Sequence, residues 1–167
     1  GFQRHGVLPD IVTMGKPMGN GQPIAGLLAT ADVLAEFGKT SRYFNTFAGN
    51  TVSCVAALAV LNTIERDRLV QHAAKVGKVL HDGIAALAGR HQAIGDVRGA
   101  GLFVGVELVS DRASRAPDRG LTSQVVNRMR DKGVLISACA MGHNVLKIRP
   151  PLVLTARAPG RLGRRPV

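Results

Sequence analysis

The hydrophobic residues of this chain change their period between residues 87 and 102, and that change limits the folds the chain can adopt. Between residues 69 and 87 they recur every third or fourth position, as on one face of an amphipathic helix: Leu69, Ala73, Val76, Leu80, Ile84 and Leu87. From residue 102 to residue 108 they alternate with other residues, as in a strand that buries one face. A helix followed by strands indicates a mixed fold, α/β or α+β.

The rest of the chain also alternates between helix and strand signals. Residues 9–16 are predicted to be a short strand that runs into a turn. Further strands are predicted over 24–29, which is expected to be buried, and over 134–137 and 145–149. Predicted helices run from Asp32, as the capping residue, to Phe37, over 52–66, and over 121–129 with Gly133 closing the last one. The glycine-rich segments 15–23 and 95–101 are predicted to be a loop and a turn.

The net charge of +11, from 22 Lys and Arg against 11 Asp and Glu, raises the question of nucleic-acid binding. Four of the arginines lie in the last 12 residues, and many of the others have acidic neighbours. One Tyr, five Phe and no Trp leave little material for a base-stacking surface. We therefore favour a solvated basic surface and expect no nucleic-acid partner. No apolar run approaches the roughly 18 residues of a membrane span, so we expect no membrane partner.

The two cysteines bear on the cellular compartment of the protein, and the two chain ends bear on the extent of its folded part. Cys54 and Cys139 have no close partner and no metal-ligand spacing, so we expect a reducing compartment, the cytoplasm, and no metal site. The chain opens on a polar segment that does not read as a signal peptide, and it has no initiator Met, so we expect its first residue to be an interior point of a longer protein. Residues 156–167, rich in Arg, Pro and Gly, are predicted to be a disordered tail.

One candidate for chemistry is a lysine in the first glycine-rich segment. Lys16 follows a predicted strand and lies in a turn, at the edge of a sheet where α/β proteins bind ligands. A neutral amine there can attack a carbonyl carbon. The alternative is a solvated turn lysine, which is the commoner case.

Two other candidates could bind anions. Arg149 ends a predicted strand and is followed by two prolines, so its guanidinium is suited to bind a carboxylate, unless it is an ordinary surface arginine. Thr46 lies in a Gly- and Asn-containing loop ahead of a helix, where a hydroxyl and backbone N–H groups can bind phosphate. The alternative there is simple N-capping of the helix by Asn50.

Four segments together resemble one family in order and, roughly, in spacing. They are DIVTMGKPMGNGQP (10–23), NTFAGN (45–50), RGAGLFVGVE (98–107) and KIRPPL (147–152). From about Gly1 to Thr155 the chain resembles the class III aminotransferases that depend on pyridoxal 5'-phosphate (PLP). The nearest branch is similar to alanine–glyoxylate aminotransferase 2 and also contains phospho-lyases.

This resemblance implies the C-terminal part of a fold type I PLP-dependent transferase. Residues 1–66 would be the end of the large PLP-binding domain, residues 67–155 the small α+β domain, and residues 156–167 the tail. The function would be transfer of an amino group between an amino acid or amine and a 2-oxo acid. The alternatives are phospho-lyase elimination on a phosphorylated amine and, from another class, a non-catalytic basic binding fragment.

The resemblance also implies roles for the three candidate residues. Lys16 would be the catalytic residue that forms a Schiff base with PLP, Thr46 would bind the cofactor phosphate, and Arg149 would bind the substrate carboxylate. In the family the threonine usually comes from the other subunit of a homodimer. Gln22 and Thr51 depart from the family pattern, where His or an apolar residue and Pro are more usual. In the family, the residue that stacks on the PLP ring and the residue that pairs with its nitrogen lie ahead of the lysine. Only 15 residues precede Lys16 here, and none is a candidate for the ring-nitrogen role, so we expect impaired or no activity from the isolated chain.

Overall fold

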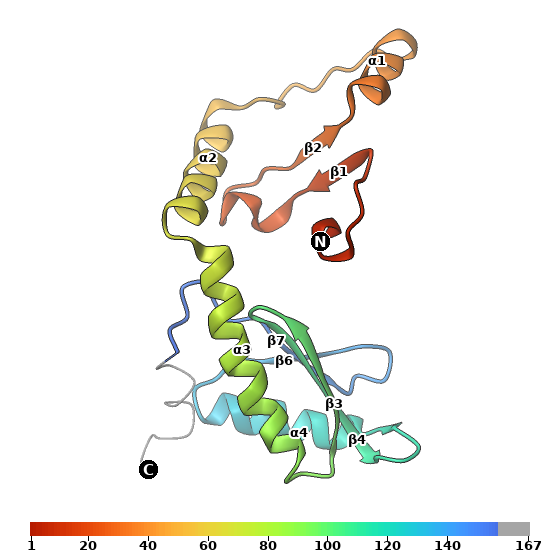
Figure 1. The fold of residues 1–167 in the computed structure, drawn as a ribbon, viewed down its shortest axis with the longest axis vertical. Coiled ribbons are helices and arrows are strands. Elements are labelled where there is room, and N and C mark those ends of the chain that lie inside the picture. The colour runs from red at the N-terminus through yellow and green to blue at the C-terminus, as the bar shows by residue number, and fades with distance from the viewer. Residues whose placement is uncertain (157–167) are drawn as a thin grey trace. The chain divides into compact units, whose positions relative to one another are not determined.

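The computed structural model describes residues 1–156, shown in colour in Figure 1. The chain divides into two compact units, the first spanning Gly1–Asp67 and the second beginning at Arg68. Of the tail predicted for residues 156–167, all but Ala156 lies outside the described residues. Within the described part of the chain, none of the helices is long and apolar enough to span a membrane.

The first unit consists of a two-stranded antiparallel sheet, two α-helices and two short 3₁₀ helices. These are η1 (Phe2–His5), β1 (Ile11–Met14), η2 (Lys16–Gly19), β2 (Gly26–Ala29), α1 (Ala31–Thr40) and α2 (Thr51–Arg66). The strands pair so that Ile11 lies opposite Ala29 and Met14 lies opposite Gly26. The turn between them contains η2, which packs against α2.

Three expectations for the first unit are corrected by the structure. The segment 15–23 is not wholly irregular, because η2 forms within it, with Pro17 at a position where its missing N–H costs no hydrogen bond. The N-cap of α1 is Thr30. Asp32 instead lies in the first turn, where its negative carboxylate interacts favourably with the positive end of the helix dipole. Strand β2 is not buried: its leucine side chains at 27 and 28 are 56% and 62% exposed, since nothing in the described chain covers them.

The second unit is a five-stranded antiparallel sheet with two helices. Its strands are β3 (Ile94–Ala100), β4 (Phe103–Asp111), β5 (Ala116–Pro117), β6 (Ser137–Cys139) and β7 (Val145–Ile148), in the order β3-β4-β7-β6 with β5 paired to β4. Its helices are α3 (Leu69–Ala88) and α4 (Arg119–Asp131). The two helices, green and cyan in Figure 1, contribute side chains to a single apolar cluster on the sheet.

The alternation predicted for residues 102–108 is confirmed and forms the centre of this core. Val104, Val106 and Leu108 are at most 4% exposed and pack with Leu146 of β7. This core is covered by the two helices, through Leu80 and Ile84 of α3 and Leu121 of α4. The helix that was expected around residues 121–129 ends as predicted, with Gly133 at φ 78°.

Two expectations for the second unit are wrong. Residues 94–100 form strand β3 and not a turn, because the glycines there allow close packing. A Cβ at Gly95 would lie 2.8 Å from a Val109 methyl group, and one at Gly99 would overlap the Phe103 carbonyl of the paired strand. The strand that was expected at 134–137 lies instead at Ser137–Cys139, where β6 pairs with β7.

Candidate functional site

Lys16 lies where strand β1 has ended and is the first residue of η2. Its backbone has φ +49°, in the left-handed region that non-glycine residues rarely adopt. The side chain is exposed, and within residues 1–156 its amine makes no hydrogen bond or ion pair. Such backbone conformations persist where the surrounding structure holds them, and they are concentrated at functional sites.

The turn that follows Lys16 is fixed by packing and by one long-range hydrogen bond. Gly19 is buried, and a Cβ there would lie 2.8 Å from Ile24 Cγ2, so a larger residue would require Ile24 to shift. Gln22 Nε2 donates a hydrogen bond of 2.9 Å to Ser53 Oγ on α2. No local pattern in the sequence indicates this contact, because the two residues are 31 positions apart.

Thr46 begins the four-residue turn that precedes α2. Asn45 shapes this turn, because its Oδ1 accepts a hydrogen bond from Phe47 N at 3.1 Å. Asn50 is the N-cap, as the alternative reading of this segment expected: its Oδ1 accepts from Ser53 N at 3.1 Å. The Thr46 hydroxyl makes no hydrogen bond to any described residue and is exposed, so it is free to bind another group.

Arg149 is the first residue after β7 and precedes Pro150. Its side chain is exposed, and its guanidinium makes no ion pair or hydrogen bond within the part of the chain that is described. Ile148 anchors it by packing against the core. Downstream, His72 of α3 lies with Nε2 2.8 Å from the Leu154 carbonyl oxygen, which holds the segment after the two prolines.

The three predicted side chains are divided between the two units. Lys16 and Thr46 belong to the first unit and share no hydrogen bond there, and Arg149 belongs to the second unit. Their roles in binding therefore stay predictions. Among residues 1–156, no group of three His, Cys, Asp or Glu side chains could hold a metal ion.

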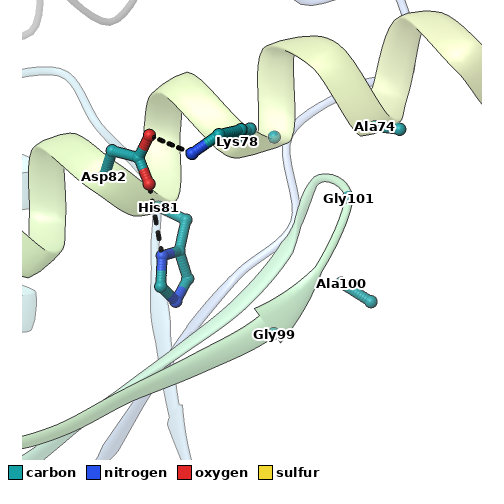
Figure 2. A pocket seen from close by; sticks show the side chains of 8 residues that line it. Ala74, Lys78, His81, Asp82, Gly99, Ala100 and Gly101 are labelled. Carbon is teal, nitrogen blue, oxygen red and sulfur yellow. Dashed lines mark hydrogen bonds and ion pairs between the residues drawn. The ribbon is translucent and has the colours of Figure 1, made fainter.

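A shallow groove lies between α3 and the turn that joins β3 to β4 (Figure 2). Lys78 Nζ lies 2.7 Å from Asp82 Oδ2, and His81 Nδ1 lies 3.9 Å from the other oxygen of that carboxylate. The opposite ring nitrogen, His81 Nε2, is 3.3 Å from the Val97 carbonyl oxygen. The ionisable groups of the groove thus interact with one another, and none of the three predicted site residues lines it.

Known proteins resemble this chain over most of its length. The model of the class III aminotransferase family matches residues 1–159. The chain is 46% identical over 155 residues to alanine–glyoxylate aminotransferase 2 homolog 2 of Arabidopsis thaliana, covering 93% of this chain and 32% of that protein. It is 41% identical over 148 residues to ethanolamine-phosphate phospho-lyase homolog 1 of Caenorhabditis elegans, covering 88% and 32%. The chain therefore spans about a third of the length of these relatives.

Solved structures resemble the chain over nearly its whole length. An Arthrobacter phospholyase in complex with phosphoethanolamine matches with a TM-score of 0.91 and 45% identity, over 97% of this chain and 39% of that one. An amine transaminase from an uncultivated Pseudomonas species, solved in its PLP-bound form, matches with a TM-score of 0.83 and 32% identity, over 96% and 38%. These likenesses confirm the expected fold class, part of a fold type I PLP-dependent transferase. The chain belongs to the class III aminotransferases, a PLP-dependent family.

Proposed function

We propose that this chain carries the PLP-binding lysine, a phosphate ligand and the carboxylate-binding arginine of an aminotransferase. The reaction is transfer of an amino group between an amino acid or amine and a 2-oxo acid. The observation that carries the proposal is Lys16, which follows β1 in a constrained turn with an amine that no described residue binds. Its surrounding sequence lies inside the matched family segment.

The chemistry of the three side chains fits PLP and an amino acid substrate. Lys16 offers an exposed primary amine, which can bind an aldehyde carbon covalently. Thr46 offers a hydroxyl ahead of a helix start, where the helix dipole favours the negative charge of a phosphate. Arg149 offers a planar cation that can pair with a carboxylate through two hydrogen bonds.

Each side chain then has a separate task. Bound PLP supplies the electron sink for the substrate carbon. Lys16 holds the cofactor through Nζ and, when that amine is free, takes a proton from the substrate and returns it. Thr46 Oγ1 donates to a phosphate oxygen, and Arg149 orients the substrate by its carboxylate.

The partners follow from the same assignment. The small-molecule partners are an amino donor and a 2-oxo acid acceptor. We propose that the complete enzyme is a homodimer, in which Thr46 binds the cofactor held by Lys16 of the partner subunit. The basis for this proposal is the resemblance of segment 45–50 to the family, in which the threonine usually comes from the other subunit. We also propose a cytoplasmic location, on the strength of two cysteines that are free in the structure.

A phospho-lyase is the second candidate, and one observation favours it. The Arthrobacter structure, at 45% identity, is a phospholyase in complex with phosphoethanolamine. Both reactions use a lysine-bound cofactor, so Lys16 and Thr46 would keep their tasks. Release of inorganic phosphate from phosphoethanolamine indicates the lyase, and amino transfer to a 2-oxo acid without phosphate release indicates the aminotransferase.

The role of Lys16 can be tested without turnover. The chain is incubated with excess PLP, reduced with borohydride and digested, and pyridoxyl-modified peptides are measured by mass spectrometry. We expect Lys16 to be modified in preference to Lys75, an exposed lysine of α3. The Lys16→Ala variant should lose the preferred adduct and keep the background at Lys75. Equal modification of the two lysines in the unaltered chain would contradict the proposal.

A further inference from the structure

A single side-chain hydrogen bond ties the turn carrying Lys16 to helix α2. Within residues 1–156, the bond from Gln22 Nε2 to Ser53 Oγ is the only hydrogen bond that a side chain of segment 15–24 makes to another element. It is partly buried, and it joins positions 31 residues apart. The other hydrogen bonds of the segment are short-range and run between backbone groups.

This tie matters because the turn holds one residue in an unfavourable backbone conformation. Lys16 has φ +49°, whereas Asn20 at φ +48° and Gly21 at φ +110° are residue types that adopt positive φ readily. The local bonds Met18 N to Gly15 O at 3.3 Å and Gln22 N to Gly19 O at 3.1 Å close the turn on itself. They do not fix it to another element, and a strained conformation persists only when its surroundings also hold it.

Ser53 connects this turn to the segment that contains Thr46. Its side chain accepts from Gln22, and its backbone N–H donates to Asn50 Oδ1. Asn50 closes the turn that begins at Thr46, with its own N–H bonded to the Phe47 carbonyl at 3.2 Å. Two successive hydrogen bonds through one serine thus connect the lysine turn with the end of the predicted phosphate-binding turn.

We propose that Gln22 is a positioning residue that holds the Lys16 turn on the start of α2. The inference rests on the proposed function of Lys16 and adds to it a residue that determines how the lysine is presented. Because Gln22 acts through Ser53, replacing either residue should have the same effect. Because the contact needs only an acceptor or donor of the right length facing a hydroxyl, glutamate at position 22 should preserve it.

The test uses the whole chain and a matched pair of variants, Gln22→Met and Gln22→Glu. Methionine keeps the length of the side chain and removes the hydrogen bond, whereas glutamate accepts one from the Ser53 hydroxyl. Amide hydrogen exchange of residues 16–22 should rise roughly 2- to 10-fold in Gln22→Met, the range for one net hydrogen bond. In Gln22→Glu it should stay near the level of the unaltered chain. Gln71→Met, at an exposed position of α3, is the control for the change of residue type.

Borohydride trapping with PLP supplies the second measurement. The ratio of pyridoxyl modification at Lys16 to that at Lys75 should fall in Gln22→Met and be restored in Gln22→Glu. Ser53→Ala should lower the ratio equally, and the double variant Gln22→Met with Ser53→Ala should lower it no further. General unfolding would instead raise hydrogen exchange across the whole first unit and would not be reversed by glutamate.

The outcomes separate this inference from the proposed function. Preferential modification of Lys16 that persists in Gln22→Met, with unchanged exchange, overturns the positioning role and leaves the lysine assignment standing. Failure of glutamate to restore the ratio also overturns it. Equal modification of Lys16 and Lys75 in the unaltered chain overturns the proposed function itself, whatever the Gln22 variants do.

Discussion

At the scale of single residues, the second unit holds a charge network on its sheet. Glu107 of β4 lies 2.8 Å from Arg98 and 3.2 Å from Arg115, and Arg98 also pairs with Asp96. The side chain of Glu107 is only 18% exposed, so its contacts are screened less than those of surface pairs. The hydrogen bond from Arg98 is the main cause that lowers the pKa of Glu107, and Arg115 adds to it.

This network predicts a pH dependence of stability. Because the pKa of Glu107 is lower in the folded chain than its ordinary value of 4.5, its contribution to stability is complete well above that pH. That contribution is lost as the pH falls through the lower folded-state value. Between about pH 6 and about pH 3, the free energy of unfolding should therefore decrease less in the Glu107→Gln variant than in the unaltered chain. Urea denaturation at several pH values measures this decrease. Arg98→Met should also reduce the loss, but by less, because Arg115 remains 3.2 Å from Glu107. An acid loss unchanged in both variants would contradict the assignment.

At the scale of elements, α3 and the hairpin of β3 and β4 approach each other closely. A Cβ at Gly77 would overlap the backbone carbonyl of Gly101. Gly101 itself has φ +52°, and its own Cβ position would lie 3.5 Å from the Ala73 carbonyl oxygen. Glycines at these two positions allow the backbones of the helix and the turn to come into direct contact. Both glycines also line the groove shown in Figure 2.

Gly77→Ala should destabilise the second unit by about 1–3 kcal/mol, the range for overpacking a site that backbone atoms enclose. Gly83→Ala is the matched control, because it lies on the same helix and a Cβ there meets nothing within 4 Å. Alanine at that position should stabilise the helix by about 0.5–1 kcal/mol. Urea denaturation of both variants checks the pair. Equal effects at positions 77 and 83 would show that α3 does not approach the hairpin this closely.

The elements that could be predicted from the sequence are those with a local signal. Periodicity located α3 and β4, and the Pro-Pro pair placed the end of β7. Strand β3 was missed because its glycines read as turn residues, although their reason is contact with Val109 and Phe103 on the paired strand. Such a contact depends on strand pairing, which no single segment reveals.

The candidate site could be predicted in its residues but not in its supports. Lys16, Thr46 and Arg149 each lie in a short contiguous motif, which can be read directly from the sequence. The bond from Gln22 to Ser53 joins segments 31 positions apart and depends on how η2 packs against α2. Residue patterns therefore indicate which groups are available, whereas their orientation depends on contacts between elements.

At the scale of the whole chain, burial is distributed unequally between the two units. Of the buried hydrophobic residues among positions 1–156, only Ala57 belongs to the first unit, and the others lie at position 69 or beyond. Both helices and both strands of the first unit carry large exposed apolar side chains, among them Leu28, Leu34 and Leu58. Since burial of apolar surface is the main favourable term in folding, the second unit supplies most of the stability of this chain.

Two leucine-to-alanine substitutions test this imbalance with identical chemistry. Leu108 of β4 is 4% exposed within the core, whereas Leu28 of β2 is 62% exposed. Leu108→Ala should cost about 2–5 kcal/mol of unfolding free energy, because it removes buried methyl groups and leaves a cavity. Leu28→Ala should stay within about 0.5 kcal/mol, as surface changes usually do. Urea denaturation of dilute protein measures both, and a cost at Leu28 approaching that at Leu108 would mean that β2 is covered in solution and that the first unit contributes a core of its own.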